Sequence, residues 1–228
     1  MFRTRILSLR VNREYPKQER DYKTMEVVLD ERVKKKEDTV ALGIAVGDYV
    51  CFDPRTVVTD SGYIKSRFLD DKLSVAAILG FAKRLKDEKL KLNRRVYAFI
   101  TVYEEVGHGC SSLPVEADSI LCMDMGCVGE GLECDEHKVS ICAKDSGQGP
   151  YDYEFTTDLI RCAKDNGIDY AVDIYPFYGS DAGAALSAGY DLKSALIGAG
   201  VYASHGYERS HVDGVRNMLE LVTKYLTK

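Results

Sequence analysis

The first fifty residues carry the alternating pattern of β-strands. In residues 6–12 every second side chain is apolar, which predicts a strand with one buried and one solvated face. Two further short runs, 25–29 and 49–52, are also predicted as strands. We expect one helical turn over 39–42, with Asp38 as its cap. These strands are too few to close a barrel, so the front of the chain is predicted to be part of a small β-domain.

After Gly62 the pattern changes to helices that alternate with continuous apolar strands. The predicted helices are 73–86, 153–166 and 212–228. The predicted strands are 96–102, 119–123, 170–174 and 194–197. This alternation is typical of a sheet covered by helices on both faces. The predicted fold class is therefore α/β: a mixed sheet flanked by helices over 59–228, preceded by a partial small β-domain over 1–58.

Composition narrows the classes of protein. A chain of 228 residues can bury one substantial core. The net charge of −5 argues against a nucleic-acid surface. No apolar run approaches the length of a membrane span, which argues against a membrane partner. The first residues lack the unbroken apolar centre of a signal peptide, so we expect a cytoplasmic protein.

The seven cysteines have no CxxC spacing, and their odd number argues against a disulfide framework. Cys122, Cys127 and Cys134 are close enough in sequence to suggest a thiolate metal site. The alternative is that they are small core residues, and we favour it because Cys122 lies in a strand-like run.

Acidic residues and one histidine follow in a fixed order: Asp70-Asp71, Glu104-Glu105, Asp124 and His205. The acidic positions lie at or just after apolar runs, and the histidine follows the last predicted strand by a Gly-rich loop. Active residues of open α/β sheets collect in such places. Carboxylates with an imidazole suit zinc, cobalt or manganese. Such a metal lowers the pKa of the water it binds from ~16 towards ~7, and a nearby free carboxylate can take the proton.

Each of these features alone has a simpler explanation. The aspartate pair could cap the following helix, and the glutamate pair could be a solvated strand end. A single histidine is more often a surface or structural residue, and we place His108, His137 and His211 in that class. Ser180-Asp181 is predicted to cap another helix. Asp124 lies among apolar neighbours, and a buried carboxylate needs a partner. The metal-site hypothesis therefore depends on the joint order and not on any one residue.

Four runs resemble the family of di-metal aminopeptidases that includes the tetrahedral, glutamyl and deblocking aminopeptidases. They are KSRFLDDK at 65–72, VYEEVG at 102–107, ILCMDMG at 120–126, and GVYASH at 200–205 followed by Glu208. The similarity extends over nearly the whole chain. It implies a zinc-peptidase-like fold, peptide substrates and a homo-oligomer, with the front β-domain mediating dimerisation.

The resemblance also implies roles for single residues. Asp70 would bridge two divalent metals, zinc or cobalt, with manganese as a third candidate. Glu105 and His205 would bind one of the metals, and Asp124 the other. Glu104 would be the general base. The implied reaction is removal of N-terminal residues from peptides through a metal-activated water.

The sequence departs from this family at its front. Family members begin with a further segment whose His-x-Asp pair supplies a metal ligand, whereas this chain has no histidine before His108. One metal keeps its full ligand set, and the other keeps only Asp70 and Asp124. We therefore expect either two bound metals or a single one, with activity impaired by the missing histidine. A truncated product, one piece of a split protein and a degenerate paralogue are the explanations that the sequence leaves open.

Two other functions compete with the peptidase hypothesis. A non-catalytic relative could keep the fold for assembly or peptide binding, as the missing histidine suggests. A glycosidase would need two carboxylates facing each other at ~5 to ~9 Å. Glu104 and Glu105 are adjacent and would point to opposite faces of a strand, and the chain has no tryptophan for sugar stacking. We therefore disfavour a glycosidase.

Overall fold

The computed structural model describes residues 2–4, 17, 19–21 and 23–228. The chain divides into two compact units, Met1–Phe52 and Asp53–Lys228. In the first unit, strand β1 (Phe2–Thr4) pairs antiparallel with β2 (Met25–Val27). The strand predicted at 6–12 lies outside the described residues. The division between the units falls slightly ahead of the predicted boundary at residue 58.

Local structure in the first unit differs from the sequence prediction in two ways. Helix α1 (Lys36–Ala41) begins before the predicted turn, and Asp38 lies inside its first turn, where its carboxylate accepts the N–H groups of Lys34 and Lys35. The strand predicted at 49–52 is irregular, and its side chains are exposed. An apolar run forms a strand only where a neighbouring strand pairs with it, and no described strand lies beside this one.

The second unit is built on a mixed sheet with the order β5-β9-β7-β8. Its strands are β5 (Ser119–Met123), β7 (Val139–Lys144), β8 (Tyr170–Ile174) and β9 (Lys193–Val201). Strand β5 runs parallel to β9, whereas β7 runs antiparallel to β9 and parallel to β8. The short strand β6 (Gly126–Cys127) extends the pairing with β9 beyond β5. The predicted α/β class with a mixed sheet is confirmed.

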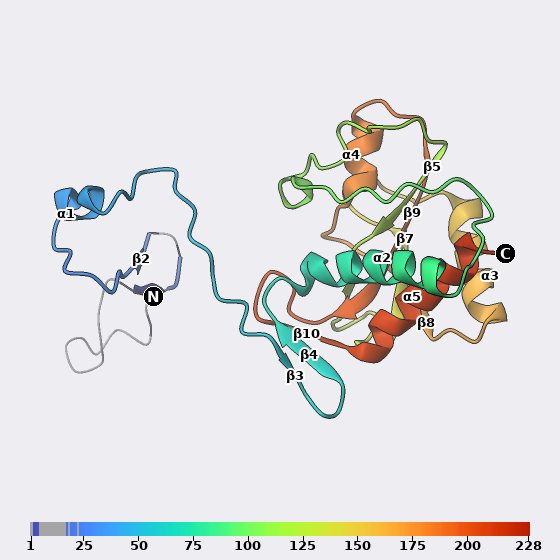
Figure 1. Cartoon of the computed structure of the whole chain (residues 1–228), viewed down its shortest axis with the longest axis horizontal. Coiled ribbons are helices and arrows are strands. Elements are labelled where there is room, and N and C mark those ends of the chain that lie inside the picture. The colour runs from blue at the N-terminus through green and yellow to red at the C-terminus, as the bar shows by residue number, and fades with distance from the viewer. Residues whose placement is uncertain (1, 5–16, 18, 22) are drawn as a thin grey trace. The chain divides into compact units, whose positions relative to one another are not determined.

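Helices cover both faces of this sheet (Figure 1). One face packs against α2 (Leu69–Asp87), α3 (Tyr153–Asp165) and α5 (Val212–Leu226). The other face packs against α4 (Asp181–Ser187). Residues alternate along the strands as the pleat requires: Ile141 and Ile197 enter the larger core, while Cys142 and Leu196 enter the smaller one.

A smaller antiparallel sheet, with the order β10-β4-β3, lies beside the start of α2. It consists of β3 (Val57–Val58), β4 (Tyr63–Ser66) and β10 (Glu208–His211). Glu208 pairs with Ser66, shortly before the Asp70-Asp71 pair at the start of α2. This sheet therefore brings the segment around residue 208 next to the aspartates.

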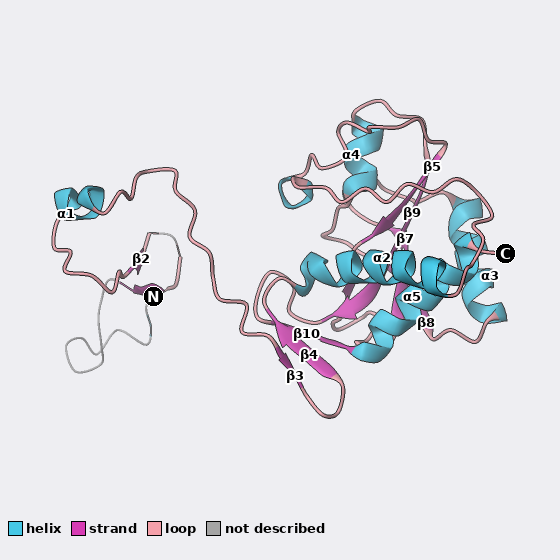
Figure 2. Ribbon diagram, in the orientation of Figure 1, coloured by secondary structure: helices cyan, strands magenta, loops and turns pink. Residues whose placement is uncertain are grey.

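Residues 96–102 are the main error of the sequence prediction. They were expected to form a buried strand, but they are irregular (Figure 2). Tyr97, Ile100 and Val102 are 53%, 49% and 84% exposed. The run is apolar enough for a strand, but no described strand lies beside it to satisfy its main-chain groups. Between α2 and β5, the part of the chain that is described contains only the single turn η2 (Glu104–Val106) and otherwise loops.

No described helix combines the length and the apolar character that a bilayer crossing requires.

The core assignment can be tested with a matched pair of leucines. Leu159 is 0% exposed and lies in the larger core, whereas Leu79 on α2 is 60% exposed. We expect Leu159→Ala to lower the free energy of unfolding by about 2–5 kcal/mol. Leu79→Ala should change it by no more than about 0.5 kcal/mol. Urea unfolding followed by circular dichroism measures both, and equal effects would contradict the assignment.

Candidate metal centre

The aspartate pair begins α2 but does not have helical geometry. Asp70 and Asp71 have non-helical backbone angles, and the peptide bond between them is cis. Phe68, at the N-cap of α2, has a left-handed φ of 64° and makes no side-chain cap. The Asp70 side chain is only 7% exposed. The chain thus turns twice within a few residues and carries both carboxylates at the turn.

Three side chains from distant parts of the chain meet at this turn. His205 Nε2 lies 3.4 Å from Asp70 Oδ2 and 3.3 Å from Glu105 Oε2. Glu105 comes from η2, and His205 comes from the loop between β9 and β10. These donor atoms lie close enough together to hold a metal ion.

Glu208 connects two of the segments that carry these residues. Its side chain is 2% exposed, and its Oε1 accepts the N–H of His205 at 3.0 Å. Its Oε2 accepts the N–H groups of Leu69 and Asp70. Burial raises the pKa of the Glu208 carboxyl, and these three backbone donors oppose that rise. The carboxylate therefore fixes the His205 loop against the aspartate turn.

Asp124 follows β5 and is buried beside Asp70. Its Oδ1 accepts the N–H of Met125 at 2.6 Å. Burial and then the charge of Asp70 raise the pKa of Asp124 well above its ordinary value. The pKa of Asp70 is raised by burial and then by the charge of Glu105. Asp70 thus interacts with Asp124 as well as with the Glu105–His205 pair.

Glu104 is half-buried next to the same carboxylates. Burial, then the charges of Asp181 and Glu105, raise its pKa to about 7. Asp181 accepts hydrogen bonds from Thr101 Oγ1 at 2.7 Å and from Cys110 N at 2.9 Å, so it anchors the chain on both sides of Glu104. The adjacent Ser180 caps α4 through its hydroxyl, as the sequence predicted for this pair.

Three residues at this centre, Asp71, Glu208 and Asp181, were given no role there by the sequence analysis. Asp71 has a pKa raised to about 9 by burial and then by the charge of Asp124. Its Oδ1 is buried without a hydrogen-bond partner among the described residues. The Asp-Asp repeat was the only signal for it. Glu208 follows the GVYASH run, but its contacts with Leu69 and Asp70, like those of Asp181, span long sequence distances.

The donor set fits a divalent cation. Ligands about 2.0–2.2 Å from one tetrahedral ion lie roughly 3.3–3.6 Å apart, and the two measured separations are 3.3 and 3.4 Å. Several carboxyls with raised pKa values and one orphaned buried oxygen also indicate missing positive charge. Cys122, Cys127 and Cys134 enter no metal-binding group within the described residues, and Cys122 and Cys134 are buried, as core residues would be.

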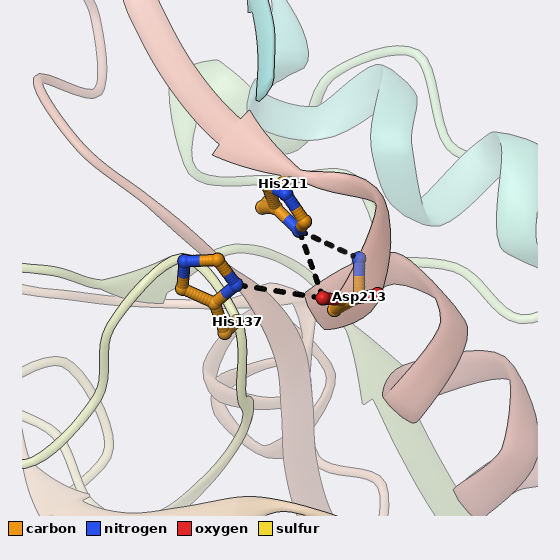
Figure 3. A group of neighbouring side chains, drawn as sticks. All are labelled: His137, His211 and Asp213. Atoms are coloured by element: carbon orange, nitrogen blue, oxygen red, sulfur yellow. Dashed lines mark hydrogen bonds and ion pairs between the residues drawn. The ribbon is translucent and has the colours of Figure 1, made fainter. Parts of the chain in front are cut away.

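A second cluster contains His137, His211 and Asp213 (Figure 3). His211 Nδ1 accepts the N–H of Asp213 at 3.1 Å and so caps α5. His211 Nε2 lies 2.8 Å from the carbonyl oxygen of Ser61. One ring nitrogen of His211 accepts a hydrogen bond and the other donates one, so both nitrogens are satisfied without an ion. These contacts of His211 are those of a structural histidine.

Comparison with known proteins identifies relatives of the chain. The family model described as M42 glutamyl aminopeptidase matches residues 6–221. YhfE of Bacillus subtilis (strain 168), which carries the name aminopeptidase, is 44% identical over 220 residues. That match covers 96% of this chain and 63% of YhfE.

Solved structures show the same fold. Aminopeptidase APDkam598 from the archaeon Desulfurococcus kamchatkensis superposes with a TM-score of 0.75 and 21% identity, over 86% of this chain and 57% of that chain. For the TET1 peptidase of Pyrococcus horikoshii the TM-score is 0.73 at 21% identity, over 89% of this chain and 60% of that chain. The chain thus spans about three-fifths of the length of these relatives. By the extent of the family match, the chain belongs to the M42 glutamyl aminopeptidase family.

Proposed function

We propose that this chain carries the catalytic centre of a metal-dependent aminopeptidase that removes N-terminal residues from peptides. The observation that supports this most directly is the convergence of Asp70, Glu105 and His205 from three distant segments. Membership of the M42 family gives the reaction class.

We assign one divalent ion to Asp70, Glu105 and His205, and a second to Asp70 and Asp124, with Asp70 as the bridge. Zinc and cobalt suit this mixture of carboxylate and imidazole ligands, and manganese is a third candidate. When bound, the metal supplies Lewis acidity, which polarises the peptide carbonyl and lowers the pKa of water.

Glu104 is assigned as the general base. It lies beside Glu105 in η2, and no ligand role is given to it. A carboxylate with a pKa near neutrality can both take and return a proton. In the proposed reaction it takes a proton from the attacking water and passes it to the leaving amine. Asp181 positions Glu104 by anchoring the chain on both sides of it.

Self-association is part of the proposal. The TET1 peptidase of Pyrococcus horikoshii assembles into a tetrahedron or a large octahedral shell. We infer a homo-oligomer for this chain as well, with its first unit as the dimerising element.

A non-catalytic relative is the second candidate. Within the described chain, Asp124 belongs to no metal-binding group that contains a histidine: His205 groups with Asp70 and Glu105, and His137 and His211 group with Asp213. A chain that holds one metal or none, without peptidase activity, would fit this second function.

The ligand assignment predicts that His205→Ala weakens zinc binding. Loss of one of three ligands should raise the dissociation constant by at least about tenfold. His137→Ala is the matched control, because His137 belongs to the other cluster, and it should leave the constant unchanged. Isothermal titration with zinc measures both. If His137→Ala has the larger effect, the ion binds at the other cluster and the assignment is wrong.

The crowding of the carboxyl groups predicts that the stability of the metal-free chain depends on pH. Glu104 has a pKa of about 7 in the fold and an ordinary value of 4.5. Between these values the folded state keeps a proton that the unfolded state has lost, so stability should fall as pH rises through this interval. Thermal unfolding in a chelator should show this fall, and it should be smaller in Glu104→Gln. Zinc should raise the melting temperature more at pH ~7 than at pH ~5. If the stability in the chelator does not change with pH, the carboxyl groups are not crowded as the structure indicates.

The role of Glu104 predicts a separation between metal binding and turnover. Glu104→Gln keeps the shape of the side chain but cannot take a proton, so turnover should fall by about 10²–10⁴. Metal content, measured by mass spectrometry of the native protein, should stay the same. Release of N-terminal residues from unblocked peptides measures turnover. Unchanged turnover would remove Glu104 as the base.

A further inference from the structure

A fully buried acid lies outside the metal centre and has no part in the proposed reaction. Asp145 follows β7 and is 0% exposed. Its Oδ1 accepts the N–H of Gln148 at 2.8 Å, and its Oδ2 accepts the hydroxyl of Tyr151 at 2.5 Å. The second bond has the length of a hydroxyl that donates to an ionised carboxylate. A buried charge needs such partners, so the position of the Tyr151 hydroxyl is strongly fixed.

The Tyr151 hydroxyl connects Asp145 to the start of α4. Its Oη lies 2.9 Å from Oγ of Ser180, the N-cap residue of α4. Burial, and then the bond to Asp145, raise the pKa of Tyr151 well above its ordinary value, so the phenol keeps its proton. That one hydrogen points to Asp145, so Ser180 donates the hydrogen between the two hydroxyls. The Ser180 oxygen then accepts the N–H of Ala182, and the cap is oriented by the buried acid.

Backbone contacts hold the two ends of this network together. The loop 146–149 is tied to the loop 177–180 through Ser146 Oγ, which accepts the N–H of Tyr178 at 2.9 Å and donates to its carbonyl oxygen at 3.0 Å. The N–H of Gly147 donates to the same carbonyl. A Cβ on Gly147 would lie 3.0 Å from a backbone atom of the other loop. The two loops are therefore in direct contact and move little relative to each other.

Asp181, the residue after the cap, contacts the segment that carries Glu104. Its Oδ2 accepts the hydroxyl of Thr101, and its Oδ1 accepts the N–H of Cys110. A Cβ on Gly109 would lie 2.3 Å from Asp181 Oδ1, so the carboxylate packs directly on that backbone. The start of α4 therefore fixes the surroundings of the proposed base.

We propose that Asp145 and Tyr151 are positioning residues for Glu104. Through the cap of α4 they hold residues 101–110 in the arrangement that turnover requires. The role in turnover rests on the proposed function of Glu104, whereas the effect on the conformation of residues 101–110 does not. The competing explanation is that Tyr151 only fills the smaller core, to which its ring belongs.

Removal of one hydroxyl separates these explanations. Tyr151→Phe keeps the ring, and hydrogen exchange in residues 101–110 of the full chain should become at least about fivefold faster, because the start of α4 loses its fixed orientation. Tyr175→Phe is the matched control, since Tyr175 is 1% exposed and its hydroxyl bonds Ser140 and Cys127 instead. It should leave this exchange unchanged. No acceleration in Tyr151→Phe, or an equal acceleration in both variants, would overturn the proposal.

A second variant tests the same path and leaves the bond between Tyr151 and Asp145 intact. Ser180→Ala removes the intermediate hydroxyl without depriving the buried carboxylate of a donor, so it decides the question if Tyr151→Phe does not fold. It should accelerate exchange in residues 101–110 to a similar degree. Combining it with Tyr151→Phe should add less than about twofold, because both changes interrupt one path. Effects that multiply in the double variant would show two independent contributions and contradict the path.

Turnover distinguishes positioning of the base from a general loosening of the fold. Tyr151→Phe should lower kcat for unblocked peptides about tenfold and change KM by less than about twofold, because the transition state alone needs the base in place. Tyr175→Phe should change neither constant. A raised KM with unchanged kcat would assign the network to substrate binding and overturn the proposal. If the parent chain hydrolyses no peptide, the proposed function fails, and the exchange measurement still decides whether the network holds residues 101–110.

Discussion

The candidate centre depends on one buried carboxylate that is hydrogen-bonded to the backbone. Glu208 accepts three backbone N–H groups, from Leu69, Asp70 and His205. Hydrogen bonds to a charged group contribute about 1.5–3 kcal/mol each, which offsets the cost of burying the acid. The pairing of β4 with β10 already brings the two segments side by side, and Glu208 adds a direct link between the aspartate turn and His205, whose φ is left-handed at 64°. Without this bridge, the strand pairing would remain, but the backbone of His205 and that of the aspartate turn would lose their common hydrogen-bond acceptor.

The other acids of the centre differ from Glu208, because each of them faces a neighbouring carboxylate. Asp70, Asp71, Asp124 and Glu104 all have raised pKa values, each chiefly through burial and then through a neighbouring carboxylate. A fold that gathers so many like charges is less stable in its metal-free form at neutral pH than one without them. Like charges gathered in this way would attract a cation, and they would lower the stability of the fold without one, so both effects have the same physical origin.

The sequence predicted the helices and strands whose formation depends on local periodicity. Helices α3 and α5 and strands β5, β8 and β9 lie where their apolar patterns placed them. The order of acids and His205 predicted a cluster, and the structure brings Asp70, Glu105 and His205 together. The anchoring roles of Glu208 and Asp181 were not predictable, because the contacts of Glu208 with Leu69 and Asp70, and those of Asp181 with Thr101 and Cys110, join residues more than seventy positions apart. Residues 96–102 were wrongly predicted as a strand because pairing depends on a neighbour that the pattern of a segment does not reveal.

Residues 96–102 also affect how long the protein persists in a cell. Native proteins protect free strand edges with charges, bulges or covering elements. Here an open edge of β5 faces an exposed apolar run with Tyr97, Phe99 and Ile100. Chaperones and proteases act on surfaces of this kind, and small changes in stability alter abundance several-fold. This edge, as the described residues leave it, is therefore the part of the second unit from which aggregation is expected to begin.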